Sequence, residues 1–253
     1  MTSTNTVLKA AGVALIVSSL AFVAVFTYLA GAFGYPDILD RGASEVLPRL
    51  AAGGGRLRTV WFLYAALPLG ILFAGAATGP VLERGGRSLR TLGVGAAVAA
   101  GLAMMIGLLR WPTIEWTLAR YWQTAPGSRP ALAAVFDASN LFLGNVLGEF
   151  IGEMCLALWF LALGIAFRRE GRRLVGSLGM VAALLLATAG LRNITTAVAV
   201  VAQINNVTLP LWLLTLGVLL LRDRRGKLGA ADVIRDDRES ASRGVHPSEA
   251  DTA

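Results

Sequence analysis

The stretch NLFLGNVLGEFIGEMCLALW, from Asn140 to Trp159, holds two charged residues, Glu149 and Glu153, in an otherwise uncharged and largely apolar segment. It lies within a longer apolar run, Ala131–Phe167. A helix that spans a membrane needs about 20 predominantly apolar residues. The run is longer than one perpendicular crossing needs, so it predicts a membrane-spanning helix that carries two acids near its middle.

Five further apolar segments have the length and composition of spanning helices. They are Ala10–Phe33, Leu57–Leu82, Leu89–Leu109, Leu174–Leu191 and Val207–Leu221. Pro68 predicts a kink or a break in the second of them. The segment from Leu174 could run on to Ala202, and the last segment is short unless it begins near Val200.

Together the segments predict an all-α fold, a polytopic transmembrane helical bundle with six spanning helices in a membrane domain of residues 10–221. The first apolar run is longer than the h-region of a signal peptide, about 7–15 residues, so we expect an uncleaved first helix. Residues 1–9 are then a cytoplasmic N-terminus. Residues 222–253 have too little apolar content to fold and predict a disordered cytoplasmic tail.

The composition excludes several classes of protein. Of 253 residues, 55% are hydrophobic and 15% are charged, whereas a soluble domain is about 25% charged. The net charge of +7 would sit in the cytoplasmic loops of a membrane protein, so we expect the lipid bilayer and no nucleic acid as partner. Cys155 and His246 are single residues of their types, so we expect no internal disulfide, no Cys/His metal site and no cofactor.

Basic residues indicate the orientation, because cytoplasmic loops are enriched in Lys and Arg. With both termini in the cytoplasm, most of the 23 Lys and Arg residues lie in cytoplasmic segments, including RREGRR at Arg168–Arg173. Only Lys9 and Lys227 are lysines, which is typical, with the many Ala and Gly, of GC-rich bacterial DNA. We therefore expect the bacterial cytoplasmic (inner) membrane, with both termini inside.

The segments on the opposite side of the membrane are longer. Trp111, Trp116, Tyr121 and Trp122 lie close together in the sequence, as in the aromatic belt at a membrane interface. A short interfacial helix is predicted around Ser44–Leu50.

Two faces of the fourth helix are distinctive, because residues four apart lie on the same side of a helix. The acidic face comprises Asp137, Leu141, Asn145, Glu149 and Glu153, and the adjoining glycine face comprises Asn140, Gly144, Gly148 and Gly152. Glycines at this spacing allow another helix to approach closely. A charge at the centre of a spanning helix costs about 2.5–3.5 kcal/mol even on the lenient scale, so we expect both acids to face protein.

Partners for the acids can be sought by depth, at about 1.5 Å of rise per residue. Counted from the cytoplasmic helix ends, Glu149, Arg192 and Arg110 fall at similar depth in the outer part of the membrane, near Asn140 and other asparagines. We predict that Arg192 or Arg110 lies within hydrogen-bonding distance of Glu149 or Glu153.

Three roles remain open for this polar cluster. An ion pair could fix the register of the helices. Two carboxylates one turn apart repel each other, so they could form a proton or cation site. The cluster could also line a pocket for a small polar ligand or a lipid head group. We find no nucleophile, metal triad or phosphate loop beside the acids, so we do not expect an enzyme.

The sequence therefore predicts an integral membrane protein with a structural or ligand-binding polar cluster near the outer face. The alternative is a small transporter coupled to protons or another cation through Glu149 and Glu153. The candidate ligand- or proton-binding residues are Glu149, Glu153, Asn145, Asn140, Asp137, Arg192 and Arg110.

Four stretches carry a resemblance to a known family. They are FGYPDILDR, GLLRWPTIEWTLARYW, NLFLGNVLGEFIGEMCLALW and LWLLTLGVLLLR, spread over about Ala11–Arg222. With them the chain resembles the bacterial membrane family named domain of unknown function 4386, most closely at Gly148, Glu149 and Trp159. The resemblance implies a multi-pass membrane protein and no particular activity. The chain departs from the family pattern just before the glycines of the fourth helix, where it has Asp137 and Asn140 in place of an aromatic or His-containing stretch.

Overall fold

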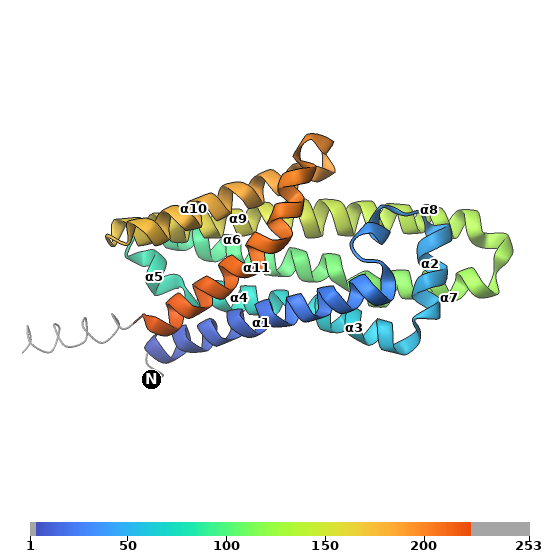
Figure 1. Ribbon diagram of the computed structural model, residues 1–253, viewed down its shortest axis with the longest axis horizontal. Helices are drawn as coiled ribbons and strands as arrows, with labels where there is room; N and C mark the ends of the chain where they lie inside the picture. The colour runs from blue at the N-terminus through green and yellow to red at the C-terminus, as the bar shows by residue number, and fades with distance from the viewer. Residues whose placement is uncertain (1–3, 224–253) are drawn as a thin grey trace, which may run out of the picture.

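Six long helices form an elongated bundle in the computed structural model, which describes residues 4–223 (Figure 1). Within these residues, six helical stretches are long and apolar enough to cross a membrane: Asn5–Phe33, Gly54–Ala77, Arg87–Thr124, Pro126–Arg169, Arg173–Asn193 and Thr196–Arg222. The predicted all-α bundle of six spanning helices is therefore confirmed. The disordered tail was predicted to begin at residue 222, but Arg222 is the last residue of α11. The rest of the predicted tail, beyond Asp223, lies outside the described residues.

The first two spans and their connection come from the N-terminal part of the chain. Its elements are α1 (Thr4–Phe33), η1 (Asp37–Asp40), α2 (Ala43–Ala52), α3 (Gly54–Ala66), α4 (Pro68–Ala77) and α5 (Gly79–Glu83). Helix α2 confirms the short helix predicted around Ser44–Leu50. Pro68 separates α3 from α4 without ending the span, because proline is tolerated at the first turn of a helix.

The third span is longer than the sequence predicted. It comprises α6 (Arg87–Leu109), the π-helical turn η2 (Trp111–Glu115) and α7 (Trp116–Thr124). We expected the helix to end at Leu109, and this boundary was wrong. Pro112 can be accommodated because the wider π-turn replaces an α-turn: the Glu115 N–H donates to the Arg110 carbonyl, five residues back, at 2.8 Å.

The fourth span also extends beyond its predicted limits. After η3 (Pro126–Ser128) it comprises α8 (Arg129–Ser139), the π-helical segment η4 (Asn140–Ile151) and α9 (Gly152–Arg169). At about 1.5 Å per residue, a 38-residue helix such as the third span is about 57 Å long, well beyond the ~30 Å hydrocarbon core. The excess forms a cap in which α2 packs against α7 and α8 (Figure 1).

The last two spans return the chain to its starting end. They comprise α10 (Arg173–Gly190), the short turns η5 (Leu191–Asn193) and η6 (Thr196–Val198), and α11 (Ala199–Arg222). Helix α11 packs along α1, so both ends of the described chain lie at the same end of the bundle (Figure 1). The last span was predicted at Val207–Leu221, and α11 begins earlier, at Ala199, close to the alternative start near Val200. The fifth span does not run on to Ala202, because α10 ends at Gly190.

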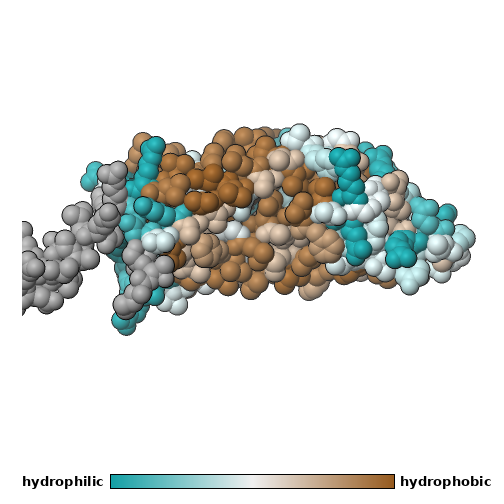
Figure 2. Space-filling model, turned by 90° about the horizontal axis from the view of Figure 1, so that it is seen from below, coloured by the Kyte–Doolittle hydropathy of each residue, from teal (hydrophilic) through white to brown (hydrophobic). Residues whose placement is uncertain are grey.

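The surface has the polarity of a membrane protein. Figure 2 shows apolar residues over the middle of the visible face and hydrophilic residues at both ends. Large apolar side chains such as Val13, Leu92 and Leu184 are exposed in the spans, an arrangement expected where lipid replaces water. The protein is therefore a multi-pass integral membrane protein.

The interior is divided into two apolar cores. One gathers side chains from α1, α4, α9, α10 and α11, including Trp159, whose Nε1 donates to Thr78 Oγ1 at 3.1 Å. The other lies in and beneath the cap, where Trp61 and Trp111 stack at 4.7 Å and Phe33 meets both edge-on. The site described next lies where the two cores meet.

Candidate ligand-binding site

The two acids of the fourth span share one arginine. Arg192, in the turn directly after α10, donates from Nη1 and Nη2 to the two carboxylate oxygens of Glu153 at 2.9 and 3.0 Å. Its Nη2 also lies 3.1 Å from Glu149 Oε2, which accepts a further hydrogen bond from Asn193 Nδ2 at 3.0 Å. The predicted ion pair is therefore present, and Arg192 is the partner.

Arg110 was the alternative partner, and it binds neither acid. It is 5% exposed, and it donates from Nη1 to the Gly107 carbonyl at 2.7 Å and from Nη2 to Asn140 Oδ1 at 2.9 Å. Its Nε has no hydrogen-bond acceptor in the described part of the chain. Among residues 4–223, no carboxylate oxygen lies within 4.0 Å of this guanidinium.

The glycine face of the fourth span packs against α6, as the sequence predicted. A Cβ on Gly148 would lie 3.1 Å from the Gly107 Cα, and one on Gly152 would lie 2.7 Å from Met104. At Gly144 the neighbour is Arg110, whose Nη2 would be 2.5 Å from an added Cβ. This face therefore admits a neighbouring helix and also makes room for a buried guanidinium.

The acidic face does not stay on one side of the bundle. Asp137 and Leu141 are exposed and lie outside the site, and Asn145 contributes only its backbone carbonyl, which accepts from Asn193 Nδ2 at 3.1 Å. The i→i+5 hydrogen bonds of η4 widen its turns, so the α-helical spacing used in the prediction misplaces residues along it. Glu149 and Glu153 remain on the site.

One buried acid was not among the sequence candidates. Glu115 is fully buried. Its Oε1 accepts from Ser139 Oγ at 2.6 Å, and its Oε2 has no hydrogen-bond partner within residues 4–223. The sequence places this residue in a presumed loop among tryptophans, so it carried no signal of burial. It lies in η2, one π-turn after Arg110.

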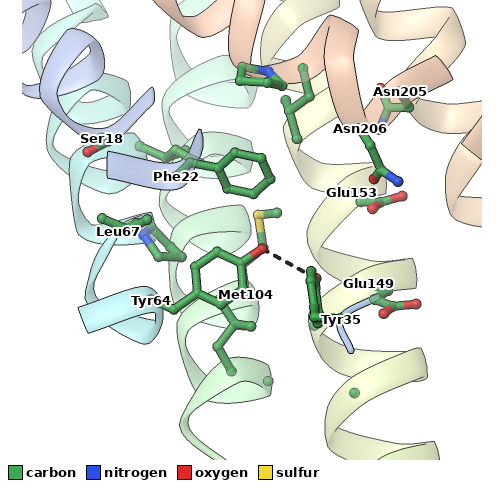
Figure 3. A pocket seen from close by; sticks show the side chains of 18 of the residues that line it. Ser18, Phe22, Tyr35, Tyr64, Leu67, Met104, Glu149, Glu153, Asn205 and Asn206 are labelled. Atoms are coloured by element: carbon green, nitrogen blue, oxygen red, sulfur yellow. Dashed lines mark hydrogen bonds between the residues drawn. The ribbon is translucent and has the colours of Figure 1, made fainter. Parts of the chain in front are cut away.

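A cavity of about 150 Å³ lies beside the two glutamates of the fourth span, Arg192 and Arg110 (Figure 3). All six spans contribute to its wall, which includes Arg110, Arg192 and both glutamates. Figure 3 shows Glu149, Glu153 and Asn206 on one side, and Phe22 and Leu67 on the other. The cavity is therefore amphipathic, with a charged wall opposite an apolar one.

Two tyrosines lie between the walls. The hydroxyls of Tyr35 and Tyr64 are 3.3 Å apart and share a hydrogen bond (Figure 3). Burial raises the pKa of the Tyr35 phenol above its ordinary value, although the hydrogen bond with Tyr64 acts in the opposite direction. The Tyr35 hydroxyl is therefore neutral near neutral pH and can both donate and accept a hydrogen bond.

No metal chemistry is indicated in the described part of the chain, where no group of three or more His, Cys, Asp or Glu side chains is placed to hold an ion. The cavity offers arginine, tyrosine and amide donors and carboxylate acceptors. Such a set can bind a small molecule that has one polar end.

The sequence model of the family described as Domain of unknown function (DUF4386) matches residues 10–217. The match includes the second to fifth spans entirely and most of the first and the last span. No curated protein and no solved structure matches the chain.

Proposed function

The chain belongs to the DUF4386 family, and from its cavity we propose that this member binds a small amphipathic molecule inside the membrane. One observation carries the proposal: all six spans contribute to a single cavity that has a charged and an apolar wall. Ligand pockets are typically lined by apolar and aromatic side chains with a few well-placed polar groups. Within a membrane, ionisable side chains are costly and mark functional sites.

The alternative is a transporter coupled to protons or another cation through Glu149 and Glu153. Both acids line the cavity, but Arg192 binds both of them. These contacts favour an ion pair that fixes α9 against the turn after α10, and they leave ligand binding as the better-supported role of the cavity.

We further propose that the protein lies in a bacterial cytoplasmic membrane with both termini in the cytoplasm. The basic loops support this orientation. Arg84, in the turn between the second and third spans, pairs with Glu170 at 3.0 Å and with Asp223 at 3.1 Å. These contacts join two connecting turns and the end of α11 at one end of the bundle, where Lys and Arg are concentrated.

A variant that fills the cavity tests the proposed function. Leu209 lines the cavity from α11, so Leu209→Trp should displace a bound molecule. Leu184→Trp is the matched control, because Leu184 is 69% exposed on α10. Native mass spectrometry of protein extracted without delipidation should show a small-molecule adduct on the wild type and on Leu184→Trp, and lose it in Leu209→Trp. Absence of any adduct, or equal occupancy in the two variants, would overturn the proposal.

A further inference from the structure

Arg110 is a buried cation without an ionic partner among residues 4–223. It lines the cavity, it makes hydrogen bonds only to neutral acceptors, and its Nε–H has no acceptor among the described residues. The guanidinium also lies over the Trp111 ring at 5.1 Å. A charge in a membrane interior is costly unless it is paired, and a guanidinium binds a carboxylate more strongly than it binds neutral acceptors. The wall at Arg110 is therefore suited to an anionic group.

The charges on the rest of the wall restrict where such a group can lie. Glu149 and Glu153 are both bound to Arg192, so Arg192 already has two carboxylate partners. Arg110 has no carboxylate oxygen within 4.0 Å among the described residues, so it is the cation left for the anionic group of a ligand. An anionic head is therefore favoured at Arg110, and the apolar part of the ligand is favoured against the opposite, apolar wall.

A groove on the lipid-facing surface between α1 and α11 adjoins the cavity. A second hollow, of about 380 Å³, shares Ser19, Phe22, Asn206 and Pro210 with the cavity wall. Its other walls are mainly apolar residues of the two helices: Leu20, Val23, Phe26, Thr27, Val207, Leu211 and Leu214.

The groove lies beyond the closest contact between α1 and α11. A Cβ on Gly12 would lie 2.6 Å from the Gly217 carbonyl oxygen, so the backbones are in contact there. From this contact α11 diverges from α1 toward the turn after α10 (Figure 1). The hollow between the diverging helices adjoins the cavity through their shared wall residues, and its lining residues Val23, Val207 and Leu211 are exposed on the surface.

We propose that the ligand is a single-chain amphiphile with a carboxylate head, of the fatty-acid class. Its head binds Arg110, and its chain leaves through the α1–α11 groove toward the lipid. This inference rests on the proposed function and specifies its ligand. A water-soluble anion would satisfy Arg110 but would not need a lipid-facing apolar groove, and a neutral lipid would not satisfy Arg110.

Photolabelling in lipid vesicles tests the inference. The probe is a long-chain fatty acid with a diazirine in mid-chain, compared with the alcohol and the amine of the same chain. Mass spectrometry should find the fatty-acid label on peptides of α1 and α11, and unlabelled fatty acid should compete it away. Because a charge-assisted hydrogen bond contributes about 1.5–3 kcal/mol, Arg110→Gln should reduce labelling about tenfold or more. Arg110→Lys keeps the positive charge, so this variant should retain part of the labelling.

A second pair of variants tests the route. Val207→Trp should block the groove and reduce labelling, whereas Val181→Trp, at a similarly exposed position on α10, should not. Equal labelling by the alcohol, stronger labelling by the amine or by an anionic two-chain phospholipid, or undiminished labelling of an Arg110→Gln protein that melts like the wild type would overturn the inference. The proposed function would still stand if Leu209→Trp displaced a native adduct of another kind, and it would fall with the inference if no adduct were found.

Discussion

At the scale of single residues, the site depends on two arginines in different circumstances. Arg192 has two carboxylate partners, and Arg110 has none among the described residues. A buried charge that loses its partner is strongly destabilising, so the two side chains should respond differently to mutation. Arg192 should matter mainly for stability, and Arg110 mainly for binding.

Removal of Arg192 should destabilise the fold. In Arg192→Met, Glu153 stays at 6% exposure without its partner, and the free energy of unfolding in detergent should fall by about 3–5 kcal/mol. The double variant Arg192→Met with Glu153→Gln should recover part of this loss. Arg49→Met is the control, since it breaks an exposed pair with Glu45 that contributes about 0.3–0.5 kcal/mol. Equal losses in the two single variants would contradict a special role for Arg192.

The sequence could predict part of this site. Helical rise alone placed Glu149, Arg192 and Arg110 at similar depth, and the structure pairs Glu149 with Arg192, which also binds Glu153. The same argument could not show which groups Arg110 binds, because its acceptors are a backbone carbonyl and an amide, which carry no charge pattern. Tyr35 and Tyr64 enter the cavity from a connecting turn and from α3, and nothing in their local sequence distinguishes them from other aromatic residues at a membrane interface.

At the scale of elements, the contact between α6 and η4 depends on the absence of side chains. Gly107 and Gly148 face each other so closely that a Cβ on Gly107 would lie 2.6 Å from the Gly148 Cα. The clash would be with backbone, which cannot move without separating the helices. This contact also holds Arg110 against Gly144, one turn away.

Gly107→Ala should therefore lower the free energy of unfolding by about 1–3 kcal/mol, as overpacking typically does. Gly95→Ala, on the same helix, adds a methyl group where no atom lies within 4 Å, and it should be neutral or stabilising because alanine favours a helix more than glycine by about 1 kcal/mol. Melting temperatures in one detergent would compare the two variants. A Gly95→Ala protein as unstable as Gly107→Ala would contradict this account.

The existence of the helices was readable from the sequence, and the ends of two of them were not. Six apolar runs were enough to predict six spans, since hydrophobic length is a strong signal in a membrane. The third and fourth spans continue into polar, aromatic sequence, where Pro112 and several arginines suggested a loop. The continuation depends on π-turns and on packing against α2, and these are tertiary features.

At the scale of the whole molecule, the orientation in the membrane is testable because Cys155 is the only cysteine. In a Cys155→Ser background, Ser88→Cys and Ser128→Cys place exposed thiols at opposite ends of the bundle. A membrane-impermeant maleimide should label Ser128→Cys in intact cells and label Ser88→Cys only after the membrane is opened. The Cys155→Ser protein alone should stay unlabelled. The reverse pattern would overturn the proposed orientation.

The contact between Gly12 and Gly217 has a consequence for how the protein samples its surroundings. The groove opens on only one side of this contact, so it faces a single leaflet of the bilayer. With the proposed orientation, that is the leaflet away from the cytoplasm. A ligand that reached the cavity through the groove would report the composition of that leaflet alone, and its occupancy would follow changes in lipid asymmetry that leave the total lipid content of the membrane unchanged.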